Sequence, residues 1–319
     1  MGDVRLGNQI EQLQNTFTCA VLGLRRCTKG YEEMRHPTEN LSWGIIELQV
    51  TNLARAVDFW TDAIGLHIRS QDKAKAELGT PNKTLIILHA GAKRPVGRAF
   101  LGMYHVAIGM PDQAEFSRVL ARLITKNITI SPTDHLASKS IYFSDPDGLE
   151  IEIIFETPER FSHMGDPSKG LMMYDVDGNP HSGREALDVP AELSHAAGAD
   201  VEAMLGDGSF LAHMHFKVST LEDGQVWFEG LGFQRNLLIP SFGFADMSAG
   251  GTTTHRLAMN VWSGPGLSGA PAGMARLVRY TLHAHDAELL ARVQGLTPAG
   301  DGLAGVDPAG VDVKMLPAA

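Results

Sequence analysis

One pattern of segments recurs along the 319 residues, and it limits the folds open to this chain more than any other feature. The first copy begins at Trp43 with a strand-like segment over 44–50. Asn52 is placed to cap a helix over 53–63, which ends at a glycine, and a further strand is predicted over 84–89. A strand, a helix and three more strands make a βαβββ module, a half-cup of sheet with its helix outside.

The second copy of the pattern begins at Tyr104, where a strand-like run opens with a histidine in second place. A helix is predicted over 113–125, and an Asp-Pro-Asp-Gly turn at 145–148 leads into a last strand over 150–155. A module of this kind exposes a concave face, so two modules side by side enclose a cavity. The ends of the strands point into that cavity, where a functional site is expected.

Two further copies follow in the C-terminal half. Module three repeats module one, with a strand over 212–218 and a helical stretch that ends at the glycine 232. Module four repeats module two more loosely, with a strand over 276–283 and an Asp-Pro-Ala-Gly turn at 307–310. Internal repetition at this scale indicates a fold assembled from equivalent units.

The predicted fold is therefore α+β, with four βαβββ modules in two pairs, each pair a cupped mixed sheet with its helices outside. The predicted boundaries are an N-terminal extension over 1–42, an N-terminal domain of modules one and two over 43–156, a linker over 157–208 that is rich in Gly, Pro, Asp and Ser, and a C-terminal domain of modules three and four over 209–319.

Composition excludes several classes of function. A formal net charge of −10 argues against a nucleic-acid surface, which needs clustered lysine and arginine. The apolar run 18–24 is too short to span a bilayer, and the two arginines after it do not fit a signal peptide. The only cysteines, Cys19 and Cys27, form neither a disulfide framework nor a thiolate metal site. The expectation is a cytoplasmic protein with no membrane or nucleic-acid partner.

Two residues in the second module carry candidate chemistry. His105 opens the first strand, and Glu152 follows the Asp-Pro-Asp-Gly turn among apolar neighbours. Imidazole nitrogen and carboxylate oxygen on two strands of one small unit are ligands suited to a divalent metal. From the residues alone, the alternative is a pair of partly buried polar groups that hydrogen-bond to each other.

The repeated order of first strand, helix-to-glycine junction and Asp-Pro-x-Gly turn resembles the vicinal oxygen chelate superfamily, which contains glyoxalases, bleomycin-resistance proteins and extradiol dioxygenases. The resemblance covers about 43–156 and 208–316. Within the superfamily, the chain is most similar to two-domain catechol 2,3-dioxygenase-like members, in which two histidines and a carboxylate hold Fe(II) or sometimes Mn(II).

The resemblance implies a role for several residues. His105 matches the second metal-binding histidine, and Glu152 matches the metal-binding glutamate. Tyr142 matches a tyrosine that hydrogen-bonds substrate. His135 falls near the place of a histidine that handles protons, and His89 is the candidate for the histidine that faces dioxygen. For all three of these residues, the alternative reading is an ordinary core or loop-edge side chain.

The chain departs from the family pattern at the first histidine. Ile45 stands at that place in module one, and an aliphatic side chain binds no metal. Glu47 is the candidate substitute, two residues further on the same face of the strand and about 6–7 Å away. In the C-terminal pair, His213 fits the first ligand position, but Arg279 and Lys314 replace the other two. We therefore expect no metal in the C-terminal pair.

The resemblance implies an extradiol ring-cleavage dioxygenase for a catechol-type or related vicinally oxygenated substrate, with dioxygen as co-substrate and Fe(II), Mn(II) or another divalent metal as cofactor. The alternatives are a metal-free binding protein for a small aromatic molecule, which Ile45 would suit, and a glyoxalase-like lyase or isomerase. Fold likeness alone does not choose among them. Association into homo-oligomers through strand edges is common in the family and stays open.

Overall fold

The structure is a computed structural model that describes residues 39–166 and 170–318. The apolar run 18–24, both cysteines and most of the predicted N-terminal extension lie outside the described residues. Among the residues that are described, no helix is both long and apolar enough to cross a membrane.

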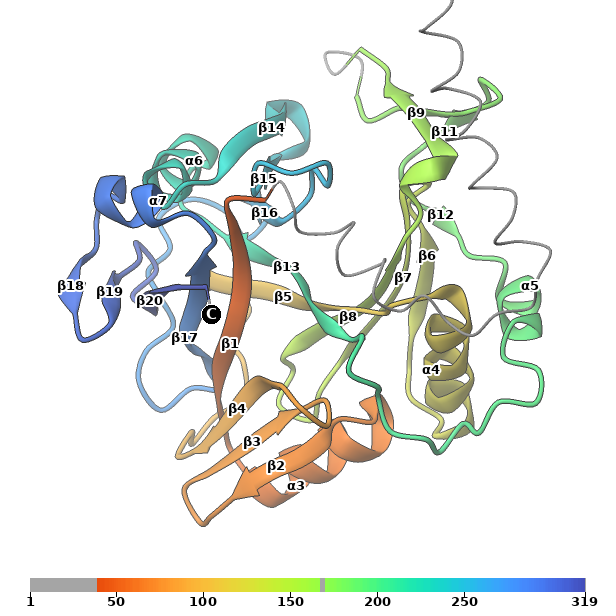
Figure 1. Ribbon diagram of the computed structural model, residues 1–319, viewed down its shortest axis with the longest axis horizontal. Helices are drawn as coiled ribbons and strands as arrows, with labels where there is room; N and C mark the ends of the chain where they lie inside the picture. Colours follow the sequence, from red (N-terminus) through yellow and green to blue (C-terminus); the bar gives the residue numbers. More distant parts are fainter. Residues whose placement is uncertain (1–38, 167–169, 319) are drawn as a thin grey trace, which may run out of the picture. The chain divides into compact units, whose positions relative to one another are not determined.

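Four βαβββ modules follow one another along the chain, as the repeats predict (Figure 1). Module one contains β1 (Leu41–Val50), α3 (Leu53–Phe59) with its π-helical continuation η1 (Trp60–Ile64), β2 (His67–Gln71), β3 (Lys75–Gly79) and β4 (Thr84–Ala90). Module two contains β5 (Gly102–Gly109), α4 (Gln113–Thr125), β6 (Ser131–Asp134), β7 (Ser138–Ser144) and β8 (Glu150–Glu156). The α+β fold class is confirmed.

The C-terminal half repeats this order. Module three contains β13 (Phe210–Lys217), α6 (Leu221–Gly230), β14 (Gln234–Ile239), the short η4 (Pro240–Phe242), β15 (Phe244–Ser248) and β16 (Leu257–Asn260). Module four contains β17 (Arg276–Ala284), α7 (Ala287–Arg292), β18 (Thr297–Ala299), β19 (Gly302–Val306) and β20 (Asp312–Pro317).

The modules do not pair as the sequence suggested. We expected module one to share a sheet with module two, and module three with module four. Instead β1 pairs antiparallel with β17, which joins modules one and four in the sheet β18-β19-β20-β17-β1-β4-β3-β2. Likewise β5 pairs with β13, which joins modules two and three in the sheet β12-β6-β7-β8-β5-β13-β16-β15-β14. The span 43–156 is therefore divided between two sheets.

The pairing was mispredicted because the sequence patterns report interactions within a module and not those between modules. Each module is specified by local patterns, whereas the partner of its first strand is chosen by contacts between distant segments. Across β1 and β17, Glu47 stands opposite Arg279 and pairs with it at 3.0 Å. Across β5 and β13, His105 stands opposite His215. These cross-strand pairs favour the observed partners and are invisible to a pattern read within one module.

The segment predicted as a linker contains regular secondary structure. It contains η2 (Pro158–Arg160), β9 (Phe161–Met164), β10 (Met173–Asp175), β11 (Pro180–His181), β12 (Glu185–Ala186) and α5 (Val189–Ser194). Strands β9, β10 and β11 form a separate three-stranded sheet, which extends from the end of β8 in Figure 1. Strand β12 returns to pair with β6, so this segment borders the concave face of the second sheet.

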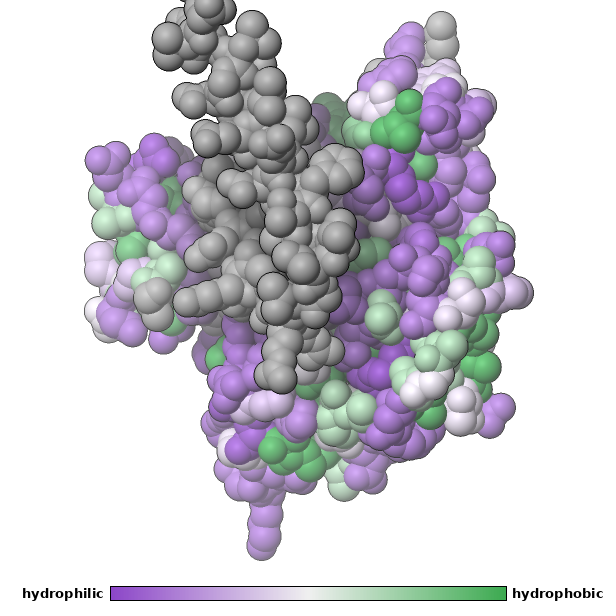
Figure 2. Space-filling model, turned by 45° about the vertical axis from the view of Figure 1, so that its right-hand side comes forward, coloured by the Kyte–Doolittle hydropathy of each residue, from purple (hydrophilic) through white to green (hydrophobic). Residues whose placement is uncertain are grey.

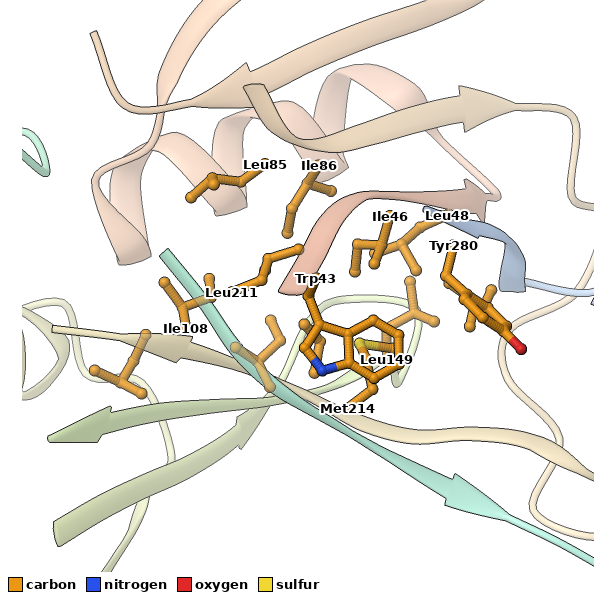
Figure 3. Close-up of a cluster of buried hydrophobic side chains, with 14 of the residues drawn as sticks. Trp43, Ile46, Leu48, Leu85, Ile86, Ile108, Leu149, Leu211, Met214 and Tyr280 are labelled. Atoms are coloured by element: carbon orange, nitrogen blue, oxygen red, sulfur yellow. The ribbon is translucent and has the colours of Figure 1, made fainter. Parts of the chain in front are cut away.

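The hydrophobic core is continuous between the two sheets (Figure 3). Trp43 contributes its ring to contacts with Phe216 and Tyr280, at centroid distances of 6.2 and 5.8 Å. Its indole nitrogen donates to the carbonyl oxygen of Arg256 at 2.6 Å. Because β1 and β13 belong to different sheets, these contacts fix one sheet against the other.

The described surface is mainly polar on the face shown in Figure 2, where smaller hydrophobic areas lie between hydrophilic residues. Exposed large hydrophobic side chains do occur, among them Ile68, Val226 and Trp262. Single exposed residues of this kind are normal on protein surfaces.

Both Asp-Pro-x-Gly turns are built alike, and both bury their first aspartate. Asp307 Oδ1 accepts hydrogen bonds from the backbone nitrogens of Ala309 and Val311, each at 2.9 Å. Gly310 has φ of +80°, a conformation that favours glycine. Burial raises the pKa of Asp307 to about 6, although the backbone donors oppose this shift.

The raised pKa predicts a pH-dependent stability. The folded protein holds a proton on Asp307 more tightly than the unfolded chain does, so the free energy of unfolding should fall as the pH rises from about 4 to about 6. Asp307→Asn keeps an acceptor oxygen but cannot ionise. Relative to the unmodified protein, the variant should therefore gain up to about 3 kcal/mol in urea unfolding between pH 4 and pH 7.5. Asp301→Asn, at an exposed carboxylate, is the control, and equal curves for Asp307→Asn and the unmodified protein would contradict the prediction.

Candidate metal centre

Three neighbouring strands of the second sheet place two histidines and a glutamate on its concave face. Strand β5 lies between β8 and β13 and carries His105. Ala107 of β5 is in register with Glu152 of β8 on one side and with His213 of β13 on the other. The small alanine side chain leaves room above the strand, and His105, two residues earlier on the same face, completes the group.

The donor atoms of these three residues converge. His105 Nε2 lies 3.0 Å from Glu152 Oε2, and His213 Nε2 lies 3.1 Å from the same oxygen. The two Nε2 atoms are 3.2 Å apart. Ligands at right angles around one ion, with bonds of about 2.1 Å, are about 3 Å from each other. The spacing of the three donors therefore suits a single divalent ion.

The hydrogen bonding of Glu152 also fits a metal. Its Oε1 atom accepts from the hydroxyls of Ser140 at 2.5 Å and Tyr142 at 3.0 Å. Among the described residues, no hydrogen-bond donor meets its buried Oε2 atom in good geometry, although both histidine nitrogens lie near. A buried carboxylate oxygen without a donor is costly, and a cation would remove that cost.

The charge states suit metal ligands as well. Burial raises the pKa of Glu152, but the neighbouring His213 and His105 outweigh it and hold that pKa well below its ordinary range. Burial lowers the pKa of His213 to about 4. At neutral pH the glutamate is thus ionised and His213 is neutral, which are the forms that bind a metal.

Tyr142 and His135 extend the network from Glu152. Tyr142 lies 2.9 Å from His135 Nε2, and His135 Nδ1 lies 2.6 Å from the carbonyl oxygen of Gly183. A carbonyl only accepts, so Nδ1 carries a proton, and burial lowers the pKa of His135. In the neutral imidazole Nε2 is then an acceptor. The single hydroxyl proton of Tyr142 consequently has two acceptors, His135 and Glu152, and can move between them.

A second polar group lies on the module-three side of the site. His255 stands beside His213 with ring centroids 4.6 Å apart, and its Nδ1 pairs with Asp246 at 2.8 Å. Burial lowers the pKa of His255, but the hydrogen bond and charge of Asp246 outweigh it, so the net shift is upward. His215 accepts a hydrogen bond from Asn260 at 2.8 Å and packs against His105.

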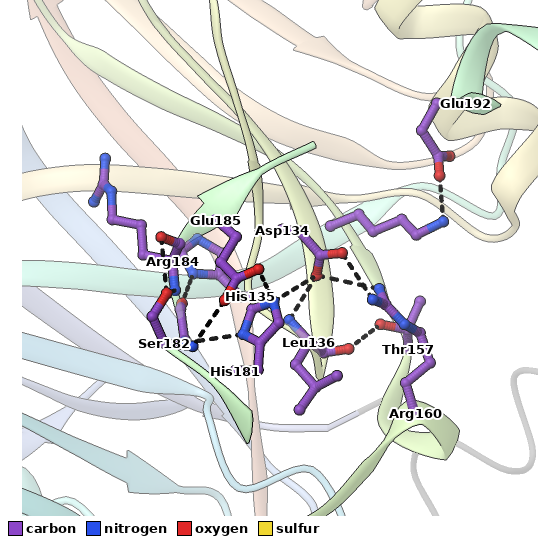
Figure 4. Close-up of polar contacts among 12 residues, drawn as sticks. Asp134, His135, Leu136, Thr157, Arg160, His181, Ser182, Arg184, Glu185 and Glu192 are labelled. Carbon is purple, nitrogen blue, oxygen red and sulfur yellow. Dashed lines mark hydrogen bonds and ion pairs between the residues drawn. The ribbon is translucent and has the colours of Figure 1, made fainter. Parts of the chain in front are cut away.

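The loop that carries His135 is braced by a network of polar contacts (Figure 4). Asp134 pairs with Arg160 at 2.7 Å and accepts from the backbone nitrogen of Leu136 at 2.7 Å. Leu136 has φ of +66°, which non-glycine residues rarely adopt. Strain of this kind persists only where the surroundings impose it, and it often marks a functional loop. Arg184 directly precedes β12, and its guanidinium carbon lies 5.6 Å from the centroid of the Tyr142 ring.

The structure brings four of the six predicted site residues together and leaves two elsewhere. His105, Glu152, Tyr142 and His135 form one connected group. Glu47 lies on β1 in the other sheet, where it pairs with His89 at 2.6 Å and with Arg279 at 3.0 Å. Both Glu47 and His89 are thus committed to a separate ion-pair cluster. The third donor of the group is His213 instead.

His213 was assigned to a C-terminal pair in which no metal was expected, and that assignment changes with the sheet pairing. The sequence signal was present, since His213 lies five residues before Val218 as Ile45 lies five before Val50. Its partner was misjudged because module three was matched with module four. His255 was not predicted, because nothing in the sequence indicates that it faces His213.

The comparisons with known proteins agree with this fold. A family model described as the glyoxalase/bleomycin resistance protein/dioxygenase superfamily matches residues 43–153. A catechol-2,3-dioxygenase of Bacillus subtilis (strain 168) is 29% identical over 260 residues, which are 79% of this chain and 87% of that protein.

Solved structures show the same architecture. A putative dioxygenase from Bacillus subtilis superposes with a TM-score of 0.52 at 16% identity, over 87% of this chain and 85% of that one. A variant of glyoxalase I from Zea mays superposes with a TM-score of 0.50 at 15% identity, over 89% and 96%. At these identities the likeness concerns the fold.

Paired sheets of βαβββ modules, with nitrogen and oxygen donors on a concave face, define the class of protein. The chain contains, over residues 43–153, a region of the glyoxalase/bleomycin resistance protein/dioxygenase superfamily, also called the vicinal oxygen chelate superfamily.

Proposed function

We propose that the protein is an Fe(II)-dependent extradiol dioxygenase that opens the ring of a catechol-type substrate next to its two hydroxyls. The observation that carries this proposal is the convergence of His105, His213 and Glu152 within 3.2 Å of one another on the concave face. Two histidines and one carboxylate are the ligand set of non-haem Fe(II) oxygenases, and they leave coordination positions open. The catechol-2,3-dioxygenase among the relatives supports the same reaction.

The bound ion would supply Lewis-acid stabilisation of the catechol oxygens and the redox chemistry that dioxygen requires. The rest of the chemistry falls to side chains of this chain. Glu152 holds its Oε2 toward the two histidines because Ser140 and Tyr142 anchor its other oxygen. The ionised Glu152 and the neutral His213 need no proton loss before they bind a divalent ion.

Two groups handle protons in the proposed reaction. Tyr142 can pass its hydroxyl proton to the acceptor Nε2 of His135 and take up a proton from a substrate hydroxyl in its place, while its hydrogen bonds orient the substrate oxygen. His255 stands beside His213, and Asp246 keeps it protonated more readily than a free histidine. His255 is therefore the general acid that delivers a proton to the developing oxygen anion.

Ile45 no longer favours a metal-free binding protein, because the position that it fills belongs to the other sheet. Manganese or another divalent ion remains an alternative to iron for the same donors. The cytoplasmic location, the absence of nucleic-acid and membrane partners, and a homo-oligomer stay predictions.

The proposal is tested by dioxygen consumption. Protein purified without oxygen and loaded with Fe(II) should consume dioxygen when catechol or a substituted catechol is added, and a yellow ring-opened product should form in equal amount. Loading with Mn(II) and Zn(II) in parallel identifies the active ion. No consumption with any catechol in a panel, or isomerisation of a thiol–aldehyde adduct in its place, would overturn the dioxygenase assignment and favour glyoxalase-type chemistry.

The role of His255 gives a separate prediction. His255→Gln should lower the rate of ring opening by about 10²–10⁴-fold, since positioned general acids contribute that much. Its iron content should not change, because the side chain is not among the three converging donors. His195→Gln, an exposed histidine at the end of α5, is the matched control. Equal loss of iron and activity in His255→Gln would assign it to metal binding instead.

A further inference from the structure

We propose that a cavity at the junction of the two sheets binds a small organic carboxylate with an apolar body, at a site separate from the metal centre. The cavity has a volume of about 540 Å³. Its walls are the start of β5, the end of β13, the start of β17 and both Asp-Pro-x-Gly turns. Three of the four modules thus contribute to it, and its volume is typical of sites for small molecules.

Part of the wall is apolar. The residues that form it are Val96, Phe100, Leu101, Leu149, Leu277 and Val311. A wall of this kind accepts the hydrocarbon or aromatic part of a ligand and gains free energy as water leaves both surfaces.

The charged side chains of the cavity are mostly cationic. Arg98, Lys217 and Arg276 line it, in a protein whose formal net charge is −10. Two carboxylates also line it. Asp147 is engaged by Thr51 and by Arg55 at 2.6 Å, and Glu150 accepts from Ser144 at 2.9 Å. The excess of positive charge therefore favours the binding of an anionic ligand.

Within the described part of the chain, the three cations lack the partners that a structural role would provide. No ion pair of Arg98, Lys217 or Arg276 occurs among the described residues, and the buried Nε of Arg276 has no hydrogen-bond acceptor there. Burial lowers the pKa of Lys217, although the charge of Glu150 opposes the shift. An unpaired, partly buried cation costs free energy in the empty protein. A carboxylate between Lys217 and Arg276 would remove this cost and satisfy the free N–H.

The cavity is adjacent to the metal centre without including it. None of His105, Glu152 and His213 lines it, whereas Tyr104 and Glu150 belong to its wall. Lys217 lies four residues after His213 on β13, at the end of that strand. An occupant would thus contact the strands that carry the metal-site residues, and its binding does not depend on the proposed function.

Isothermal titration calorimetry with 2-naphthoate tests the proposal, and neutral 2-naphthamide serves as the matched probe. We expect 1:1 binding of the acid and at least tenfold weaker binding of the amide. Lys217→Met with Arg276→Met keeps the side-chain stems and removes both charges, so affinity for the acid should fall at least tenfold. Arg292→Met, an exposed arginine of α7, should bind as the unmodified protein does.

Two further variants keep the test decisive. His213→Ala should still bind 2-naphthoate with unchanged stoichiometry, which separates the cavity from the metal centre. Arg98→Met changes an exposed loop residue and should weaken binding at least threefold even if the double variant fails to fold. Equal affinity for acid and amide, loss of binding in His213→Ala, or unchanged affinity in Arg98→Met and in the folded double variant would each overturn the proposal.

Discussion

Replacement of His213 by alanine is expected to remove stoichiometric Fe(II) from the protein and to abolish turnover of catechols. His213 supplies one of three donors that converge within 3.2 Å, and its imidazole is buried where water replaces it poorly. Loss of groups that only orient metal ligands costs about 10–100-fold in metal affinity, so loss of a ligand should cost at least about 100-fold. Elemental analysis after anaerobic loading and a competition titration with a chelator measure the change.

The controls come from the residues that the sequence favoured. Glu47→Gln and His89→Gln alter the ion-pair cluster of the other sheet, and both should keep full iron content and turnover within about threefold. Ile45→His should acquire no additional metal. Normal iron in His213→Ala would contradict the role of His213 as a ligand. Loss of iron in Glu47→Gln with the fold intact would show that the metal binds through β1 instead.

Replacement of Arg256 by methionine is expected to lower the free energy of unfolding by about 3–5 kcal/mol, the largest stability effect predicted here. The Arg256 side chain is 5% exposed and pairs with Glu39 at 2.8 Å and with Glu156 at 2.6 Å. It thereby connects the chain before β1 with the end of β8. Removal of the guanidinium breaks both ion pairs of this buried arginine and takes a cation away from two carboxylates that are largely shielded from water. Urea unfolding followed by circular dichroism measures the loss.

Two comparisons separate burial from ion pairing in this result. Arg235→Met removes an arginine that also pairs with two glutamates, Glu222 and Glu229, but at an exposed position, so it should cost less than about 1 kcal/mol. Adding Glu39→Gln and Glu156→Gln to Arg256→Met removes the two carboxylate charges with which Arg256 pairs and should recover part of the loss. A cost for Arg256→Met no larger than that for Arg235→Met would contradict the prediction.

The modules themselves could be predicted from sequence because each rests on local chemistry. Asn52 accepts from the backbone nitrogen of Arg55 at the start of α3, as a capping residue should. Gly65 ends the following helical turn with φ of +93°. The Asp-Pro-x-Gly turns fold alike at 145–148 and 307–310. In each turn the aspartate side chain accepts a hydrogen bond from the backbone nitrogen four residues later, and the glycine adopts a positive φ. Signals of this kind act over a few residues and survive in a single sequence.

The metal centre could be predicted only in part, because its members come from two halves of the chain. His105, Glu152 and Tyr142 belong to one module, and their spacing within it was sufficient. His213 and His255 reach the same place through the pairing of β5 with β13, which joins positions about 108 residues apart. The sequence pattern within one module does not indicate with which other module its first strand will pair. The two Asp-Pro-x-Gly turns are likewise far apart in the sequence, so the cavity that they both line could not be predicted from it.

The strand registers show how the two cups correspond. His105 stands opposite His215 and beside Glu150, while Arg279 stands opposite Glu47 and beside Asp312. Glu152 lies two residues after Glu150 and Lys314 lies two residues after Asp312, so Lys314 occupies the place of Glu152. Likewise His213 lies two residues before His215 and Ile45 lies two residues before Glu47, so Ile45 occupies the place of His213.

The nested order of the modules, with one against four and two against three, is the arrangement that results when two copies of a two-module chain exchange partners and are then joined end to end. In such a symmetric dimer both cups must carry the same residues, and any substitution appears twice. Joining the copies ends that constraint. One cup can keep a histidine, a histidine and a glutamate, while the other replaces them with Ile45, Arg279 and Lys314 and becomes a scaffold held by ion pairs.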